Sequence, residues 1–330
     1  MTRTAPTTGI DLRERWRRLQ LAPDGRPRPE APFGRGPLAA RVLAAAIGAG
    51  ASVGGRLPAG LAHRLAVAGG TLEWAARPAK RRRLAENLAH ALALPADDEN
   101  VRRLVRQEVV NEARRSADLL WALDRPADLL AATEVVGREH LERALAGGRG
   151  IILASLHVGG WEVAAAVPAR VVRVPTTVIV TDDWLAWAIH RLRAAAGLRI
   201  HFRSGPAPAA ASVLRRGEAL LVLGELEGSA GSRRYPVHFL DGVAELQAGP
   251  AALARLCGSP IVPFSVLPLA PRRWRVEIEQ PIAAPDRVEG EAGERRTLQA
   301  LADRWTELVR RHPEHWAAVY PMRWLARGAE

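Results

Sequence analysis

The sequence is poor in cysteine and lysine. Cys257 is the single cysteine among 330 residues. An internal disulfide and a cysteine-based zinc site are therefore excluded, which fits a reducing compartment. Lys80 is the only lysine, so almost all of the positive charge is carried by arginine. A GC-rich coding sequence would give the same bias, so the arginine content alone does not assign a function.

Long hydrophobic runs are also lacking. The first 30 residues are rich in Arg, Pro and Thr and contain no apolar stretch of the kind found in a secretory signal. We therefore expect the protein to stay inside the cell. The most apolar early segment, residues 42–55, is too short and too rich in glycine for a helix that spans a bilayer. Peripheral contact with a membrane is the most that it would give.

What the chain does have is a large excess of positive charge. The formal net charge is +12, in a composition that is 48% hydrophobic and 25% charged and therefore globular. Such a charge favours an anionic partner, and nucleic acid and anionic lipid headgroups both qualify. The sequence contains no motif in which basic and aromatic residues alternate for nucleic-acid binding, so we expect an anionic membrane surface and no nucleic acid.

The composition divides the chain near residue 35. Residues 1–35 combine proline and arginine with few aliphatic side chains, which predicts a flexible basic tail. Residues 36–330 are expected to form one domain. Its first part, residues 36–70, is rich in Ala and Leu and predicts two short helices separated by Pro58, with one face suited to a bilayer. The basic run at residues 80–83 is either a solvated helix start or a contact for anionic headgroups.

The rest of the chain alternates between helical and strand patterns. Residues 97–123 have the spacing of a long amphipathic helix. Beyond residue 148, β-branched runs alternate with helical stretches, which predicts an α/β fold with a mixed, mostly parallel central sheet flanked by helices. Strands are predicted at residues 151–157, 176–181, 219–225, 259–269 and 274–282, and further helices at residues 162–169, 184–196, 207–216, 248–257 and 290–311.

Two titratable residues stand where the first of these strands gives way to a helix. His157 ends the strand, Gly159 and Gly160 form a turn, and Glu162 begins the helix. Ligands gather at the carboxyl ends of strands in such sheets, and the glycines would let a substrate approach closely. A carboxylate folded back onto the imidazole would prepare it to take a proton from a hydroxyl. Alternatively, His157 is a buried histidine bonded to a backbone carbonyl, and Glu162 is an ordinary acid of a first helical turn.

The segment "GRGIILASLHVGGWEVA" resembles the G-R-G, H and W-E block of the bacterial lipid A biosynthesis acyltransferase family, which includes phosphatidylinositol-mannoside acyltransferases. The similarity extends from about Arg77 to Trp324. It includes "RRRLAENLAHALAL", "RLRAAAGLRI", the region from "LVLGELEG" to "GSPIVPFSV", and "RHPEHWAAVYPMRW". These blocks occur in the order that the family has.

This resemblance implies transfer of a fatty acyl group from an acyl-CoA or acyl carrier protein thioester to a hydroxyl of a lipid or glycolipid acceptor. It implies no metal and no bound cofactor. His157 would be the general base and Glu162 its orienting carboxylate. Glu225 would join the environment of His157 or help to place the acceptor, and Arg193 would bind a phosphate or stabilise the oxyanion. Substrate contacts are also expected from Gly159, Gly160, Trp161 and Glu227, although Trp161 also has the pattern of a core residue.

Three departures from the family pattern leave a second interpretation open. Gly160 replaces the usual asparagine, Leu226 separates Glu225 from Glu227 where a polar residue is common, and the terminal block lacks the usual paired arginines. A protein that kept the fold as a non-catalytic lipid-binding or scaffold protein would also fit. For the enzyme, the resemblance implies a peripheral position on the cytoplasmic face of the cell membrane.

Overall fold

The computed structural model describes residues 53–122, 125–161, 174–180, 193, 198–202, 207–225 and 232–325. The predicted tail at residues 1–35 and residues 36–52 of the expected N-terminal helices lie outside these ranges. The predicted helix at residues 162–169 lies outside them too, as does all of the predicted helix at residues 184–196 except Arg193.

A seven-stranded sheet forms the centre of the described part of the molecule. All neighbouring strands are parallel except β8 and β9, which are antiparallel, so the predicted mixed and mostly parallel sheet is confirmed. The order across the sheet is β1 (Thr133–Val136), β9 (Arg273–Ile278), β8 (Ile261–Ala270), β2 (Ile151–Ser155), β5 (Ala219–Leu223), β3 (Thr176–Val180) and β4 (Arg199–Phe202).

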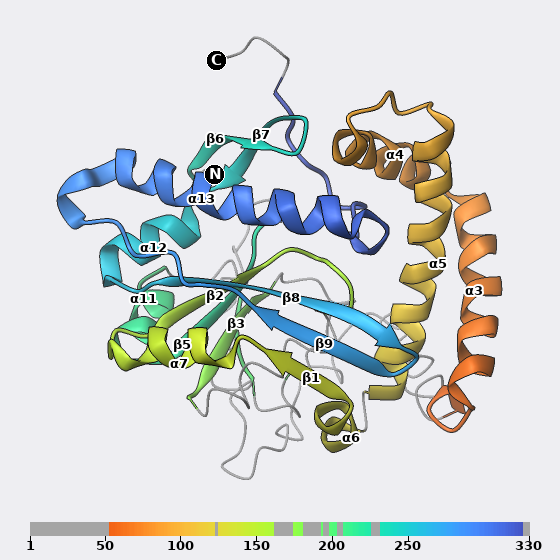
Figure 1. Ribbon diagram of the computed structural model, residues 1–330, viewed down its shortest axis with the longest axis horizontal. Helices are drawn as coiled ribbons and strands as arrows, with labels where there is room; N and C mark the ends of the chain where they lie inside the picture. The colour runs from red at the N-terminus through yellow and green to blue at the C-terminus, as the bar shows by residue number, and fades with distance from the viewer. Residues whose placement is uncertain are drawn as a thin grey trace, which may run out of the picture.

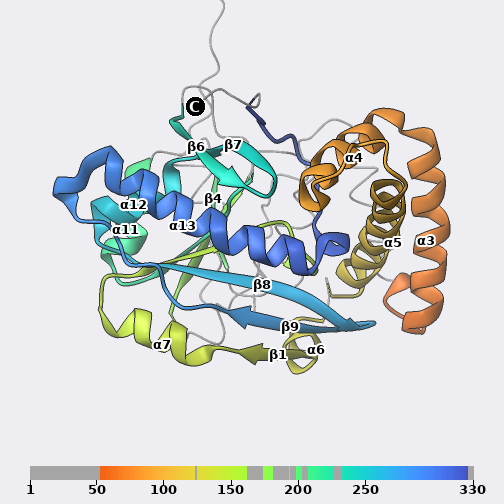
Figure 2. The same cartoon turned by 45° about the horizontal axis from the view of Figure 1, so that its top comes forward.

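Both faces of the sheet are buried, which explains why its central strands read as continuous apolar runs. In β2, Ile152 and Ala154 pack into one hydrophobic cluster, whereas Ile151 and Leu153 pack into another on the opposite face. Figures 1 and 2 show helices above and below the sheet. The first face is covered by α11 (Ala207–Arg215), α12 (Gly249–Cys257), α13 (Gly290–Arg311) and the hairpin of β6 (Arg234–Phe239) and β7 (Gly242–Gln247), and the second by α6 (Pro126–Ala131) and α7 (Arg138–Ala146).

Three further helices stand beside the sheet (Figure 1). They are α3 (Ala59–Ala76), α4 (Pro78–Leu92) and α5 (Glu99–Ala122). Two of them, α3 and α5, extend to the turn between β8 and β9 (Figure 1). Pro58 directly precedes α3, and the helix continues six residues past the end expected at Gly70. A Cβ at position 70 would lie 2.8 Å from Cβ of Ala113, so this glycine lets α3 pack closely on α5 and does not end the helix.

The basic run at the start of α4 divides into two halves. Lys80 forms ion pairs with Glu112, at 2.8 Å, and with Glu73. Arg81 donates hydrogen bonds to two carbonyls at the end of α3. Arg82 and Arg83 are exposed, so only the second half of the run faces solvent. Every helix in the described ranges is too short or too polar to cross a bilayer.

Candidate functional site

Strand register brings His157 and Glu225 together. β2 and β5 are parallel neighbours, and Ser155 pairs with Leu223 at their carboxyl ends. His157 follows Ser155 by two residues, and Glu225 follows Leu223 by two residues. The N–H of Gly224 donates to the carbonyl of Ser155 at 2.9 Å, so the pairing of β2 and β5 continues one residue beyond the end of β5. The pair therefore lies at the edge of the sheet where α/β proteins place their ligands.

The two side chains are in direct contact and almost fully buried. Nδ1 of His157 lies 3.0 Å from Oε1 of Glu225, and the side chains are 2% and 1% exposed. The same oxygen accepts the backbone N–H of His157 at 2.5 Å. The contact with Nδ1 has the distance of an ion pair but not the angle of a hydrogen bond. Oε2 of Glu225 is buried and has no hydrogen-bond partner among the described residues.

This arrangement suits proton transfer at the opposite ring nitrogen. The carboxylate lies on the Nδ1 side, so Nε2 is the nitrogen that points away from Glu225. A buried carboxylate that is short of hydrogen bonds gains from a positive charge beside it. Glu225 would therefore stabilise the imidazolium that forms when Nε2 takes a proton, and would fix the orientation of the ring.

The glycine turn after His157 is set by close packing. Gly159 has a φ of +60°, and a Cβ there would lie 1.9 Å from the carbonyl oxygen of Val266. A Cβ at Gly160 would lie 2.6 Å from Cδ1 of Trp274. Both positions therefore require glycine so that β8 and Trp274 can approach the turn. The sharp turn agrees with the sequence, and the expected close approach of a substrate to these glycines stays a prediction.

Aromatic side chains and the C-terminal segment enclose the imidazole. The ring of Trp161 meets it edge-on at 4.2 Å between centroids, and the ring of Tyr320 lies 4.1 Å away. The backbone carbonyl of His157 accepts the N–H of Ala317 at 2.8 Å. The segment that follows α13 therefore closes over the strand end that carries His157.

Asn87, on α4, fastens this segment in place. Its amide nitrogen donates to the carbonyls of Ala318, at 2.7 Å, and Tyr320, at 2.9 Å. Its amide oxygen accepts the indole N–H of Trp324 at 2.9 Å. Sequence reasoning named neither Asn87 nor Tyr320 as a site residue. A signal for Asn87 was present, because it is a polar residue on the buried face of a helix otherwise lined by leucines.

The structure describes only some of the remaining predicted site residues. Glu162 and Glu227 lie outside the described residues. Arg193 is buried, and its carbonyl accepts the N–H of Leu198 just before β4. Trp161 does contact that ring and is only partly buried, which leaves both of its interpretations, acyl-groove wall and core, open.

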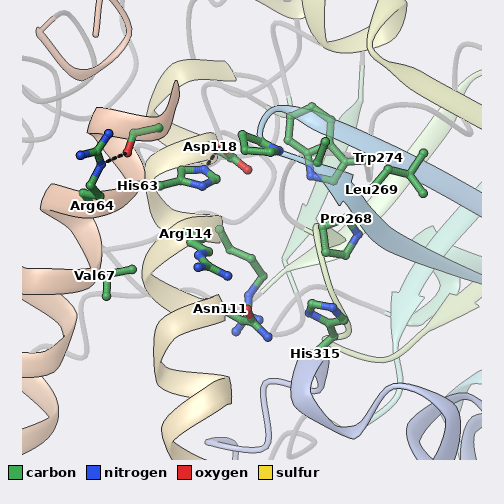
Figure 3. Close-up of a pocket in the computed structure, with 14 residues that line it drawn as sticks. His63, Arg64, Val67, Asn111, Arg114, Asp118, Pro268, Leu269, Trp274 and His315 are labelled. Atoms are coloured by element: carbon green, nitrogen blue, oxygen red, sulfur yellow. Dashed lines mark hydrogen bonds and ion pairs between the residues drawn. The ribbon is translucent and has the colours of Figure 1, made fainter. Parts of the chain in front are cut away.

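A cavity of about 620 Å³ opens beside the glycine turn, between α3, α5 and the end of β8 (Figure 3). It shares a wall with the turn, because Trp274 lines it and packs on Gly160. His315, also in the lining, accepts the N–H of Gly159 through its carbonyl at 2.8 Å. Within the described residues, no three His, Cys, Asp or Glu side chains group as metal ligands.

Comparison with known proteins agrees with the resemblance read from the motifs. The family model described as bacterial lipid A biosynthesis acyltransferase matches residues 41–325, which include every described strand and the His157–Glu225 pair. No curated protein sequence matches the chain at a significant level. The family match covers most of the chain, so the chain belongs to the bacterial lipid A biosynthesis acyltransferase family, whose members are acyltransferases that act on lipids.

Proposed function

We propose that the protein is an O-acyltransferase that moves a fatty acyl group from a CoA or acyl carrier protein thioester to a hydroxyl of a lipid or glycolipid. The observation that carries the proposal is the buried contact between Nδ1 of His157 and the carboxylate of Glu225 at the carboxyl ends of neighbouring strands. The family membership supplies the reaction type.

In the proposed reaction, the acceptor hydroxyl attacks the carbonyl carbon of the thioester while Nε2 of His157 takes the hydroxyl proton. A tetrahedral intermediate forms with negative charge on the former carbonyl oxygen. Its C–S bond then breaks, and the departing sulfur receives the proton from the imidazolium. The products are an ester and a free thiol, and His157 returns to its neutral form. We assign Arg193 to the oxyanion or to a phosphate, as the resemblance implies.

Two carboxylates are candidates for the group that orients the imidazole. Glu162 is the acid of the H-x-x-x-x-E pattern, and Glu225 is the acid in contact with Nδ1. We propose that Glu225 orients the ring from the Nδ1 side. Glu162 keeps its proposed role as an orienting carboxylate through the resemblance alone, and Glu227 and Trp161 are proposed to contribute to the donor or acceptor site.

We also propose that the enzyme works as a peripheral protein on the cytoplasmic face of the cell membrane. Support comes from α3, where Leu61, Leu65 and Leu72 are exposed by 40%, 57% and 73%. Spacings of four and seven residues put these leucines on one face of the helix. An apolar stripe on a protein of net charge +12 suits the surface of an anionic bilayer.

The proposed activity is tested by incubating the protein with an acyl-CoA or acyl carrier protein that carries a labelled acyl chain, together with a total lipid extract. We expect label in one lipid class with the wild-type protein. The His157→Ala variant should transfer about 10²–10⁴-fold more slowly, because it lacks the general base. Wild-type protein that binds the lipids but leaves the thioester intact would support a non-catalytic lipid-binding protein instead.

A further inference from the structure

Three arginines and two histidines from separate elements are among the residues that line the cavity beside the glycine turn. α3 contributes His63 and Arg64, and α5 contributes Arg114 and Arg115. His315 enters from η4 (Pro313–His315), the short helix that follows α13. Figure 3 shows Arg114 beside α5 and His315 near Pro268, with Asn111 between them in this view. The lining therefore concentrates positive charge next to the proposed catalytic turn.

Carboxylates within the described residues balance only part of this charge. Asp118, the one acid in the lining, is buried, and its Oδ1 lies 2.7 Å from Nε2 of His63. Arg115 is paired through Nη2 with Glu108 at 2.6 Å. Its Nη1 is buried and has no hydrogen-bond partner among the described residues. The described carboxylates therefore leave part of the positive charge of the lining unbalanced.

Arg114 and Arg64, the other two arginines of the lining, are also available to a ligand. Arg114 is exposed and forms no ion pair with any acid in the described ranges. Arg64 makes only a 3.4 Å hydrogen bond to the carbonyl of Gly60. A guanidinium presents several N–H groups in one plane, which is the geometry that recognises a phosphate through two parallel hydrogen bonds.

His315 responds to this positive field. Burial lowers the pKa of its imidazole, and Glu314 opposes that shift in part. Arg115, His312 and Arg114 then lower the pKa further. Its Nδ1 is buried without a hydrogen-bond partner among the described residues. An anion in the cavity would relieve the mutual repulsion of these groups.

We propose that this cavity binds a phosphate group carried by one of the two reaction partners, with Arg114 and Arg64 as its main contacts. The inference rests on the proposed acyl transfer and adds a position for the phosphate, next to the turn that holds His157. The apolar part of the lining, formed by Pro268, Leu269 and Trp274, would contact the portion of the ligand that joins the phosphate to the reacting group.

Binding is measured by calorimetry on the full chain carrying His157→Ala, so that turnover does not interfere. Coenzyme A represents the phosphates of the donor. Dihexanoyl phosphatidylglycerol, kept below its micelle concentration, represents the phosphodiester of a lipid acceptor. In this background we compare Arg64→Ala/Arg114→Ala with Arg143→Ala, which removes an exposed arginine on α7, remote from the cavity (Figure 1).

We expect the paired substitution to weaken binding of one probe by about 10–100-fold, because charge-assisted hydrogen bonds are lost. Arg143→Ala should have no effect, and Arg114→Lys should retain part of the affinity. A loss confined to coenzyme A assigns the cavity to the donor, whereas a loss confined to the phosphodiester assigns it to the acceptor. Equal affinities in the paired variant and in Arg143→Ala would overturn the inference. Failure of acyl transfer in the labelling assay would count against the proposed function and leave this binding result standing.

Discussion

Among single residues, Gly160 and Trp274 are packed so closely that the indole fills the volume beside the glycine. Trp274 is 1% exposed, and its ring occupies the position that a side chain at residue 160 would need. A side chain as large as the asparagine of the family pattern would therefore not fit at residue 160 beside Trp274.

We predict that Gly160→Ala destabilises the protein by about 1–3 kcal/mol, because the new methyl group overlaps the indole. Trp274→Leu should also destabilise it, through the volume left empty. The double variant should lose less than the sum of the two, because the smaller side chain makes room for the methyl group. Urea denaturation of the four proteins measures this coupling, and losses that simply add would show that the two residues do not share the space.

The His157–Glu225 pair shows what residue patterns predict about a site and what they miss. His157 was found because a histidine at a strand end before two glycines is an unusual pattern. Local spacing points to Glu162 as a partner of His157, and this stays a prediction because Glu162 lies outside the described residues. Glu225 lies 68 residues away, and its contact depends on β2 and β5 being neighbours in register. Sequence gives strands but not which strands pair, so Glu225 was identified only through the resemblance.

Among the helices, α5 packs against α3 and α4, and it contains a buried acid, Glu108. Burial raises the pKa of Glu108 from its ordinary value of 4.5 to about 7, although Arg115 opposes the shift. Between these two pH values the folded protein binds more protons at Glu108 than the unfolded chain does. The free energy of unfolding should therefore fall as pH rises through this window.

Glu108→Gln removes this titration, so we predict that wild-type stability falls relative to the variant between pH 5 and pH 7.5. The measurement is urea unfolding of both proteins at the two pH values. Glu99→Gln, on the same helix but with a side chain 74% exposed, is the matched control and should show a smaller change. A stability difference between wild type and Glu108→Gln that is the same at both pH values would contradict the prediction.

Elements with strong periodicity were predicted well, and short ones were not. The amphipathic pattern gave α13 with both of its ends, and the apolar runs gave β2, β3, β5, β8 and β9. β1 and β4 have only four residues each, too few to establish a period. β6 was not predicted, because it contains a proline and two basic residues. Such residues fit β6 because it pairs only with β7, in a small antiparallel hairpin outside the main sheet.

At the scale of the whole molecule, the apolar stripe on α3 and the net charge of +12 predict binding to anionic vesicles. Leu65→Ser/Leu72→Ser should weaken that binding by roughly tenfold for each leucine, because apolar area is no longer buried. Binding by the wild type should also weaken with added salt. Sedimentation with phosphatidylglycerol vesicles measures both effects.

The matched control for this experiment is Val136→Ser/Val288→Ser. These valines are 53% and 94% exposed but lie on other elements, on β1 and on η3 (Arg287–Glu289). Vesicle binding should be unchanged in this control. Equal losses in the two double variants would mean that α3 is not the membrane-contacting element.

The account as a whole depends on His157 and Glu225 acting as one unit in proton transfer. The most direct test is the rate of labelled acyl transfer by His157→Ala, by Glu225→Gln and by the variant with both changes, each at saturating donor. We predict that the double variant is about as slow as His157→Ala alone, because a carboxylate that acts through the imidazole has nothing left to orient. Losses that multiply, or wild-type transfer by His157→Ala, would contradict the account.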